Sequence, residues 1–296
     1  MTAELVHAIA QLAASHDLAI DPASIRTNEA GLDYRVAFAR TQDGADWVLR
    51  MPRRADVSTK IAEERRILDF VRPSLPVAIP DWRVCSEQLV AYPLLPGKPG
   101  LTLDESGAPV WHIDPASPAF ARSLGKLIAA LHRIDSRQAA DAGLVVQSPS
   151  EVRAQWGEHI ARVAAEFTVA DALLQRWQAW LDDDSYWPTF SRFTHGELYP
   201  AHVLIDADEQ IVGVLDWTTA KVTDPAVDFA YQRAFAGPAF ELTVQAYVEE
   251  GGVVPPRLAD HCTELFAAGP VLYGVYALTT GQLEHRAAAA AALSGA

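Results

Sequence analysis

A segment rich in proline and glycine divides the chain into two parts with different secondary-structure patterns. Residues 93–100 read Pro-Leu-Leu-Pro-Gly-Lys-Pro-Gly, a composition that favours a hinge or linker over a helix or strand. Strand-like runs prevail before this segment and helical patterns prevail after it. The sequence therefore predicts an α+β protein, with a small antiparallel sheet in an N-lobe over residues 1–93 and a mainly helical C-lobe over residues 94–296.

The first part begins with apolar residues at helical spacing and continues with short strands. Asp43 and Gly44 are a turn signal between two of these strands. Charged and apolar residues then alternate in the pattern of an amphipathic helix. The expected elements are a helix over 5–14, strands over 25–28, 34–39 and 47–51, a helix over 58–71, and short strands near 81–85 and 88–92.

The second part contains helical patterns on either side of one pair of short strands. The strands cover residues 203–205 and 211–215, and a polar turn over residues 206–209 joins them. Gly269 and Pro270 predict an interruption in the last helical region. The expected helices cover residues 119–135, 149–168, 171–181, 229–250 and 256–293.

The composition of the 296 residues is that of a globular protein and excludes several classes of partner. The net charge of −14 argues against nucleic acid, since phosphate binding requires a basic surface. No apolar run reaches the roughly 18 residues that cross a membrane, and the first residues lack the pattern of a signal peptide. We expect a cytoplasmic protein without a membrane or nucleic-acid partner and, for its assembly state, a monomer. Cys85 and Cys262 are expected to be buried apolar residues.

The residues best suited to chemistry lie between His195 and Asp216. Phosphoryl transfer needs a carboxylate near the acceptor hydroxyl, ligands for Mg²⁺, and positive charge beside the donor phosphates. Protein kinases place an Asn five positions after the catalytic Asp, followed by a strand pair and a metal-binding Asp. Glu197 and His202 have this spacing, and Asp216 follows an apolar strand whose rigid backbone would hold a metal ligand. These positions favour a phosphotransferase.

The tripeptide His195-Gly196-Glu197 has two other interpretations. It matches the His-x-Glu of zinc deaminases, but that chemistry requires a downstream Pro-Cys-x-x-Cys. No cysteine lies between His195 and Cys262, which excludes this class. A polar turn between a helix and a strand is the structural alternative for the tripeptide alone. The acidic and histidine residues that follow it favour phosphoryl transfer.

With its flanking residues, this segment resembles the aminoglycoside and macrolide phosphotransferase superfamily, and the macrolide 2′-phosphotransferase family in particular. The resemblance rests on His202, on Leu-Asp-Trp-Thr over 215–218 and on Asp-Pro-x-x-Asp-Phe over 224–229, and it extends upstream to residues 28–33, 47–54, 80–82 and 91–93. It implies a two-lobed protein-kinase-like fold. It also implies transfer of the γ-phosphoryl group of GTP, or of ATP, to the 2′-hydroxyl of a macrolide amino sugar, with Mg²⁺ as the metal.

The resemblance assigns roles to individual residues. Glu197 would accept the proton of the hydroxyl, and His202 and Asp216 would hold the metal. Arg50 would contact phosphate, paired with Glu64 or with the adjacent Glu63. The other nucleotide contacts would come from the loop over 28–33, with Asn28 and Gly31, and from the hinge residues Ala91, Tyr92 and Leu94.

Two positions depart from the expected pattern, because Glu197 stands where the family has Asp and Arg50 where kinases have Lys. An added methylene moves the carboxylate by about one bond length, and a misplacement of ~1 Å can cost ~100-fold in rate. His202 is a softer ligand than Mg²⁺ prefers, so contact through water or with phosphate is an alternative to direct ligation. A kinase for an aminoglycoside or another small metabolite, and a non-catalytic nucleotide-binding module, remain as alternative functions.

The last helical region favours a macrolide among these acceptors. Residues 256–293 hold few acids and many apolar residues, whereas a site for polycationic aminoglycosides should be strongly acidic. Asp228 is expected to brace the catalytic loop through hydrogen bonds. The candidates for an apolar substrate pocket, with core packing as the alternative for each, are Phe266, Tyr273 and Tyr276.

Overall fold

The computed structural model describes residues 2–29, 31, 33–104 and 106–295. The chain divides into two compact units, which consist of residues 1–114 with 200–219 and of residues 115–199 with 220–296. These units rest on contacts within the structure and have other bounds than the predicted lobes. The division into a nucleotide-binding N-lobe over residues 1–93 and a C-lobe over residues 94–296 stays a prediction. Within the described ranges, no helix is both long and apolar enough to span a bilayer.

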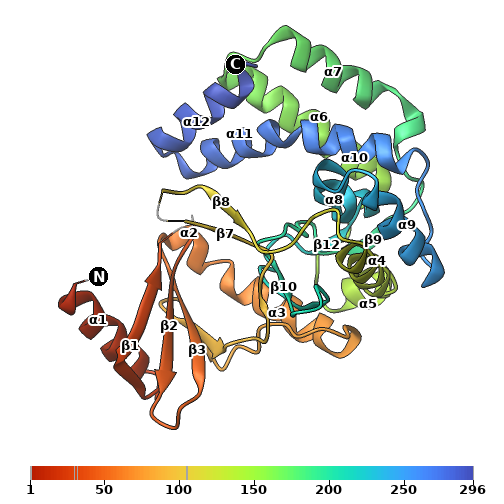
Figure 1. The fold of residues 1–296 in the computed structure, drawn as a ribbon. Helices are drawn as coiled ribbons and strands as arrows, with labels where there is room; N and C mark the ends of the chain where they lie inside the picture. The colour runs from red at the N-terminus through yellow and green to blue at the C-terminus, as the bar shows by residue number, and fades with distance from the viewer. Residues whose placement is uncertain (1, 30, 32, 105, 296) are drawn as a thin grey trace. The chain divides into compact units, whose positions relative to one another are not determined.

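The first unit is built on the predicted antiparallel sheet, drawn in red and orange in Figure 1. Its spatial order is β1-β2-β3-β5-β4. The strands are β1 (Ile20–Asn28), β2 (Tyr34–Thr41), β3 (Asp46–Pro52), β4 (Val84–Cys85) and β5 (Val90–Pro93). Three helical segments accompany them, α2 (Ala55–Ser58), α3 (Ile61–Val71) and the 3₁₀ helix η1 (Arg72–Ser74).

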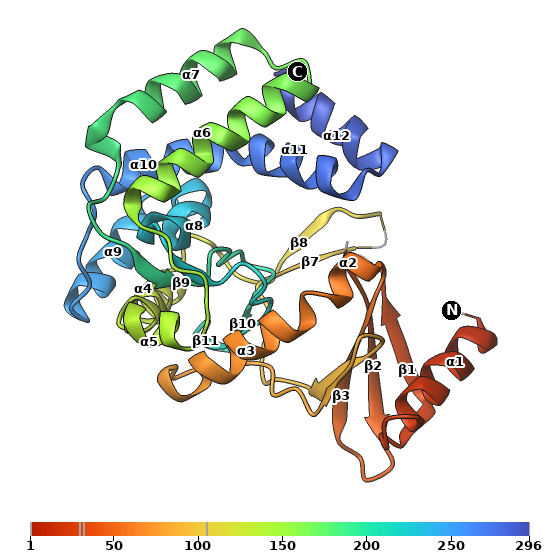
Figure 2. The ribbon, with the colours of Figure 1, turned by 180° about the vertical axis from the view of Figure 1, so that it is seen from behind.

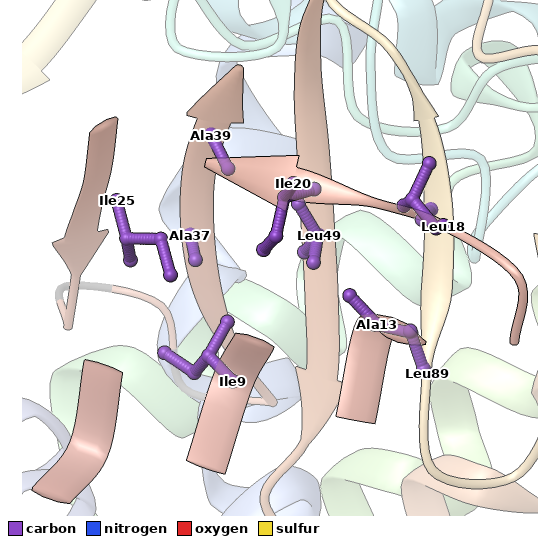
Figure 3. Close-up of a cluster of buried hydrophobic side chains, with 10 residues drawn as sticks. Ile9, Ala13, Leu18, Ile20, Ile25, Ala37, Ala39, Leu49 and Leu89 are labelled. Carbon is purple, nitrogen blue, oxygen red and sulfur yellow. The ribbon is translucent and has the colours of Figure 1, made fainter. Parts of the chain in front are cut away.

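Helix α1 (Ala3–Ala14) packs its apolar side chains against this sheet. Side chains alternate between the two faces of a strand, so Arg50 and its neighbour Leu49 on β3 point in opposite directions. Leu49 therefore joins the core under α1, while Arg50 lies on the other face. Figure 3 shows this core, which includes Ile9, Ala13, Ala37, Ala39 and Leu49.

A second, three-stranded sheet of order β11-β10-β6 contains the predicted hairpin. Its strands are β6 (Lys98–Pro99), β10 (Val203–Ile205) and β11 (Ile211–Val214). The predicted hinge segment thus contributes a short strand. A Cβ atom on Gly97 would lie 2.8 Å from the carbonyl oxygen of Ile205, so glycine allows this close pairing. A further hairpin of β7 (Leu101–Leu103) and β8 (Pro109–Trp111) was not predicted.

The second unit is mainly helical. Helix α4 packs along α9, and α6 lies beside both α7 and α11 (Figures 1 and 2). Two short strands, β9 (Arg192–Thr194) and β12 (Lys221–Thr223), pair antiparallel on either side of the 203–214 hairpin in sequence. The helices are α4 (Pro118–His132), α5 (Ser136–Asp141), α6 (Pro149–Glu166), α7 (Asp171–Asp182), η2 (Asp184–Tyr186), η3 (Pro225–Phe229), α8 (Ala230–Phe235), α9 (Ala239–Glu249), α10 (Leu258–Ala267), α11 (Gly269–Thr280) and α12 (Leu283–Leu293).

The long helices predicted near the end of the chain are divided. The predicted helix over 229–250 is divided into α8 and α9, with Gly237 and Pro238 between them. The predicted interruption at Pro270 is confirmed, because α11 begins there. A second break follows at Gly281, whose φ of 64° is the left-handed conformation that ends many helices.

The two cysteines differ in exposure. Cys262 is buried, as predicted, whereas Cys85 is exposed and the prediction that it is buried was wrong. Cys85 lies on the edge strand β4 of the sheet, where one side of the strand has no neighbour.

Candidate active site

Arg50 and Glu64 form a buried ion pair in the first unit. Arg50 projects from β3 and Glu64 from α3, and the distance between Nη1 and Oε1 is 3.0 Å. The two side chains are 9% and 1% exposed, whereas Glu63 is exposed. The ring of Tyr34 lies 4.0 Å from the guanidinium carbon of Arg50. The structure therefore selects Glu64 over Glu63 as the partner of Arg50.

The pKa values of Arg50 and Glu64 depend on each other's charge and on that of Asp216. Burial raises the pKa of Glu64, and the nearby Arg50 opposes this shift. The charge of Asp216 contributes to raising the pKa of Glu64 and also that of Arg50. Burial likewise raises the pKa of Tyr92 to about 12. A guanidinium, a carboxylate and the candidate metal ligand Asp216 thus lie near one another within the first unit.

Asp216 lies directly after the β10–β11 hairpin. Its φ of 57° is unusual for a residue other than glycine, and the Thr218 hydroxyl donates to its Oδ1 at 2.6 Å. Across the hairpin, the Leu215 amide donates to the carbonyl oxygen of His202 at 2.7 Å. The distance from His202 Nε2 to Asp216 Oδ2 is 3.9 Å. The hairpin therefore brings the two predicted metal ligands together.

The donor set of His202 and Asp216 is compatible with Mg²⁺. Among the described residues, no group of three or more His, Cys, Asp or Glu side chains could enclose a metal ion. Mg²⁺ commonly binds one or two carboxylates and takes its other oxygens from water and substrate phosphates. The Asp216 carboxylate fits this pattern, and His202 beside it could act through a water or through phosphate.

The predicted phosphate loop lies between β1 and β2 and is tied to Arg53 at the end of β3. The Arg53 guanidinium donates to the carbonyl oxygens of Gly31 at 3.1 Å and Glu29 at 3.0 Å, and to the Glu29 carboxylate at 2.6 Å. Asn28 is the last residue of β1. Two residues of the predicted loop, Ala30 and Leu32, lie outside the described residues.

The predicted hinge residues continue the sheet. Ala91 and Tyr92 are buried on β5, and Tyr92 pairs with Val48 of β3. Leu94 is 48% exposed, and its amide donates to the carbonyl oxygen of Asp46 at 2.8 Å. That amide is therefore engaged within the first unit, and so is the carbonyl oxygen of Ala91, which accepts from the Arg83 amide at 2.9 Å.

In the second unit, Asp228 holds the start of the catalytic loop. Its carboxylate accepts hydrogen bonds from the amides of His195 at 3.1 Å and Gly196 at 2.8 Å. The Glu197 amide in turn donates to His195 Nδ1 at 3.3 Å. His195 and Asp228 are 0% and 1% exposed. The prediction that Asp228 braces this loop is confirmed.

The side chain of Glu197 lies beside aromatic residues of the same unit. The Tyr231 hydroxyl donates a hydrogen bond to the Glu197 carboxylate, and burial together with the Glu197 charge raises the pKa of Tyr231. The ring of Tyr231 is 5.0 Å from that of Tyr199 and 6.0 Å from that of Phe266, between centroids. Phe266, which is 42% exposed, thus lies beside Tyr231, the residue that is hydrogen-bonded to Glu197.

The other two predicted substrate residues form a separate group. Tyr273 and Tyr276 lie on α11 with their ring centroids 6.0 Å apart. The ring centroid of His285 on α12 is 4.9 Å from that of Tyr276. The Thr280 hydroxyl is hydrogen-bonded to His285 Nδ1 at 2.9 Å. The three aromatic candidates therefore do not form one cluster.

Several residues of the site were not predicted from the sequence. No motif marked Tyr231, since a tyrosine on a helical pattern is also an ordinary core residue, and Tyr199 was given no role within the loop that follows Glu197. Asp224 was noted only as part of Asp-Pro-x-x-Asp-Phe. In the structure its Oδ2 lies 2.6 Å from Nε2 of His261, which no sequence pattern connects to it.

Comparisons with known proteins identify the family and several similar structures. A model described as the phosphotransferase enzyme family matches residues 24–261. The apoenzyme structure of macrolide 2′-phosphotransferase MphH from Brachybacterium faecium is 54% identical, covers 98% of both chains and has a TM-score of 0.91. A structure named macrolide 2′-phosphotransferase type I is 42% identical, covers 100% of this chain and 99% of its own, and has a TM-score of 0.93.

A third relative is the uncharacterized protein YcbJ of Bacillus subtilis (strain 168). It is 39% identical over 286 residues, which are 95% of this chain and 94% of YcbJ. The match of the family model over most of the chain and the fold shared with two phosphotransferases confirm the predicted two-lobed, kinase-like α+β class. The chain belongs to the phosphotransferase enzyme family.

Proposed function

We propose that the chain transfers the γ-phosphoryl group of GTP, or of ATP, to the 2′-hydroxyl of a macrolide amino sugar. The observation that carries this proposal is the identity of 54% and 42%, over nearly the whole chain, with two proteins named macrolide 2′-phosphotransferase. The residues described above include groups of the kinds that such a reaction requires.

On the donor side, Arg50 provides positive charge for the phosphates, and its ion pair with Glu64 at 3.0 Å fixes the direction of the guanidinium. Asp216 and His202 would hold Mg²⁺, which neutralises charge on the phosphates when bound. The loop with Asn28 and Gly31 and the hinge residues from Ala91 to Leu94 are the proposed contacts for the rest of the nucleotide.

On the acceptor side, Glu197 takes the proton of the 2′-hydroxyl while the oxygen bonds to the γ-phosphorus and the nucleoside diphosphate leaves. Its carboxylate must be ionised to do so. The Tyr231 hydroxyl keeps its proton because its pKa is raised, and its hydrogen bond stabilises the ionised form of Glu197. This contact also gives the longer Glu side chain a fixed position, which offsets the departure from Asp.

The body of a macrolide is apolar and requires an apolar surface. Phe266, which is 42% exposed and lies against Tyr231, is the proposed contact nearest to Glu197. Tyr273 and Tyr276 on α11 are proposed as contacts for other parts of the ring. The enzyme would act as a monomer in the cytoplasm. Phosphorylation would inactivate the antibiotic and so confer resistance.

A steady-state assay with Mg²⁺ tests the proposal. Several macrolides and the aminoglycoside kanamycin are compared as acceptors, each with GTP and ATP as donors. We expect turnover of macrolides, with GTP preferred, and none of kanamycin. Turnover of kanamycin alone would replace the macrolide by an aminoglycoside. Nucleotide binding without turnover of any acceptor would identify a non-catalytic module.

A further inference from the structure

The 3₁₀ helix η3 carries one buried aspartate and is preceded by another, and each of them faces a histidine from a different helix. Asp224, just before η3, has its Oδ2 2.6 Å from Nε2 of His261 on α10. Asp228, within η3, has its Oδ2 3.4 Å from Nε2 of His132 on α4. All four side chains are 2% exposed or less. Asp224 is therefore hydrogen-bonded to His261, whereas Asp228 only faces His132 at a longer distance.

The position of the proton on His261 follows from its two partners. The indole N–H of Trp180 points to His261 Nδ1 at 3.0 Å. An indole nitrogen is only a donor, so Nδ1 accepts this hydrogen bond and the ring carries its proton on Nε2. The Nε2–H group therefore donates to Asp224. The other carboxylate oxygen of Asp224 accepts a hydrogen bond from the amide of Ala226 at 2.8 Å. Asp224 thereby caps the N-terminus of η3.

The surroundings of His261 leave it few other roles. The ring is 0% exposed and lies among Trp180, Tyr186 and Trp187, with centroids 5.7, 6.1 and 5.1 Å away. It is too deeply buried to meet a substrate directly. Its hydrogen bond to Asp224 instead connects α10 with η3.

From η3 the connection continues to the catalytic loop. Asp228, at the other end of the segment, holds the amides of His195 and Gly196. Helix α10 also carries Phe266, which lies beside the Glu197 partner Tyr231. One helix is thus joined to the loop both through His261 and through Phe266.

We propose that His261 is a positioning residue that fixes Glu197 by holding η3 and the Asp228 brace in register with α10. The effect on turnover rests on the proposed function, while the effect on the loop does not. A carboxylate displaced by ~1 Å can lose ~100-fold in rate. Loss of the His261–Asp224 hydrogen bond is therefore expected to lower kcat while nucleotide affinity is retained.

Two substitutions separate the contacts of His261. In His261→Gln, the amide nitrogen can reach the position of Nε2 and donate to Asp224. In His261→Asn, the shorter side chain reaches only the position of Nδ1, which keeps an acceptor for Trp180 and removes the donor to Asp224. Val163→Ala is the control for stability, since Val163 on α6 is 0% exposed in the same unit and has no part in the site.

We expect His261→Asn to lower kcat by about 100-fold with an unchanged dissociation constant for GTP, and His261→Gln to restore most of the rate. Amide hydrogen exchange should become faster in His261→Asn at residues 195–197 selectively, and Val163→Ala should not show this pattern. Wild-type kcat in His261→Asn, or exchange accelerated equally across the unit as in the control, would overturn the proposal. If the wild-type protein phosphorylates no macrolide, the proposed function fails, and the exchange pattern alone still decides the role of His261.

Discussion

The guanidinium of Arg50 and the carboxylate of Glu64 are paired at 3.0 Å in the interior of the first unit, where both side chains are nearly inaccessible to solvent. The pair joins the central strand β3 to helix α3. An isolated charge at such a depth is strongly destabilising, so each partner depends on the other. The same geometry that stabilises this unit aims a positive charge at the proposed phosphate site.

Removal of Glu64 should therefore reduce both stability and nucleotide binding. We expect Glu64→Ala to lower the free energy of unfolding by about 3 to 5 kcal/mol, since it leaves the charge of Arg50 buried and unpaired. Chemical denaturation and GTP titration measure the two effects. The matched control is Asp69→Ala on the same helix, which breaks the exposed pair with Arg65 at 2.8 Å and should cost at most about 0.5 kcal/mol. Equal losses in the two variants would contradict this account.

Asp216 should be required for metal-dependent turnover. We expect Asp216→Asn to abolish phosphoryl transfer, because the neutral amide is a poor ligand for Mg²⁺, while the fold is kept by the backbone of the hairpin. Asp206→Asn is the control in the same hairpin, where the Asp206 carboxylate accepts from the turn amides of Asp208 and Gln210. It should retain wild-type kcat in a magnesium titration. An active Asp216→Asn variant would remove Asp216 from the metal site.

The two thiols should differ sharply in reactivity. Burial raises the pKa of Cys262 well above its ordinary value and that of Cys85 as well, and the thiolate is the reactive form. Since Cys85 is exposed and Cys262 is not, a thiol reagent should label Cys85 alone in the native protein, faster as the pH rises. Cys262 should react only after unfolding. Mass spectrometry of the labelled peptides measures this, and rapid native labelling of Cys262 would mean that the region around η3 opens.

Glu197 should act through the proton that it accepts. We expect Glu197→Gln to lower kcat by at least about 100-fold, the usual contribution of a general base, with the dissociation constant for GTP unchanged. Tyr231→Phe removes the hydrogen bond to Glu197 and should have a smaller effect in the same direction. Full activity of Glu197→Gln would show that another group takes the proton.

The sequence predicted the parts of the site whose positions depend on local spacing. The apolar hairpin before Asp216 returns this residue to His202, so local pairing brings the two predicted metal ligands together. The strand predicted over 47–51 is likewise confirmed as part of β3. Such relationships need no knowledge of the tertiary fold.

The sequence did not predict contacts that the fold makes between distant segments. Tyr231 meets Glu197, and His261 meets Asp224, only because α8 and α10 pack beside η3. A tyrosine or histidine on a helical pattern is as consistent with plain core packing as with a role in the site. The division of the predicted helix over 229–250 had a local signal in Gly237 and Pro238, which the long helical pattern outweighed.

The central claim is that this chain phosphorylates the 2′-hydroxyl of a macrolide amino sugar. The most direct measurement incubates purified protein and Mg²⁺ with GTP labelled in its γ-phosphate, and with either erythromycin or its 2′-O-acetyl derivative. We predict that label appears in erythromycin at the 2′-oxygen and that the acetylated compound receives none. Label in the acetylated compound, or no transfer to erythromycin although GTP binds, would contradict the claim.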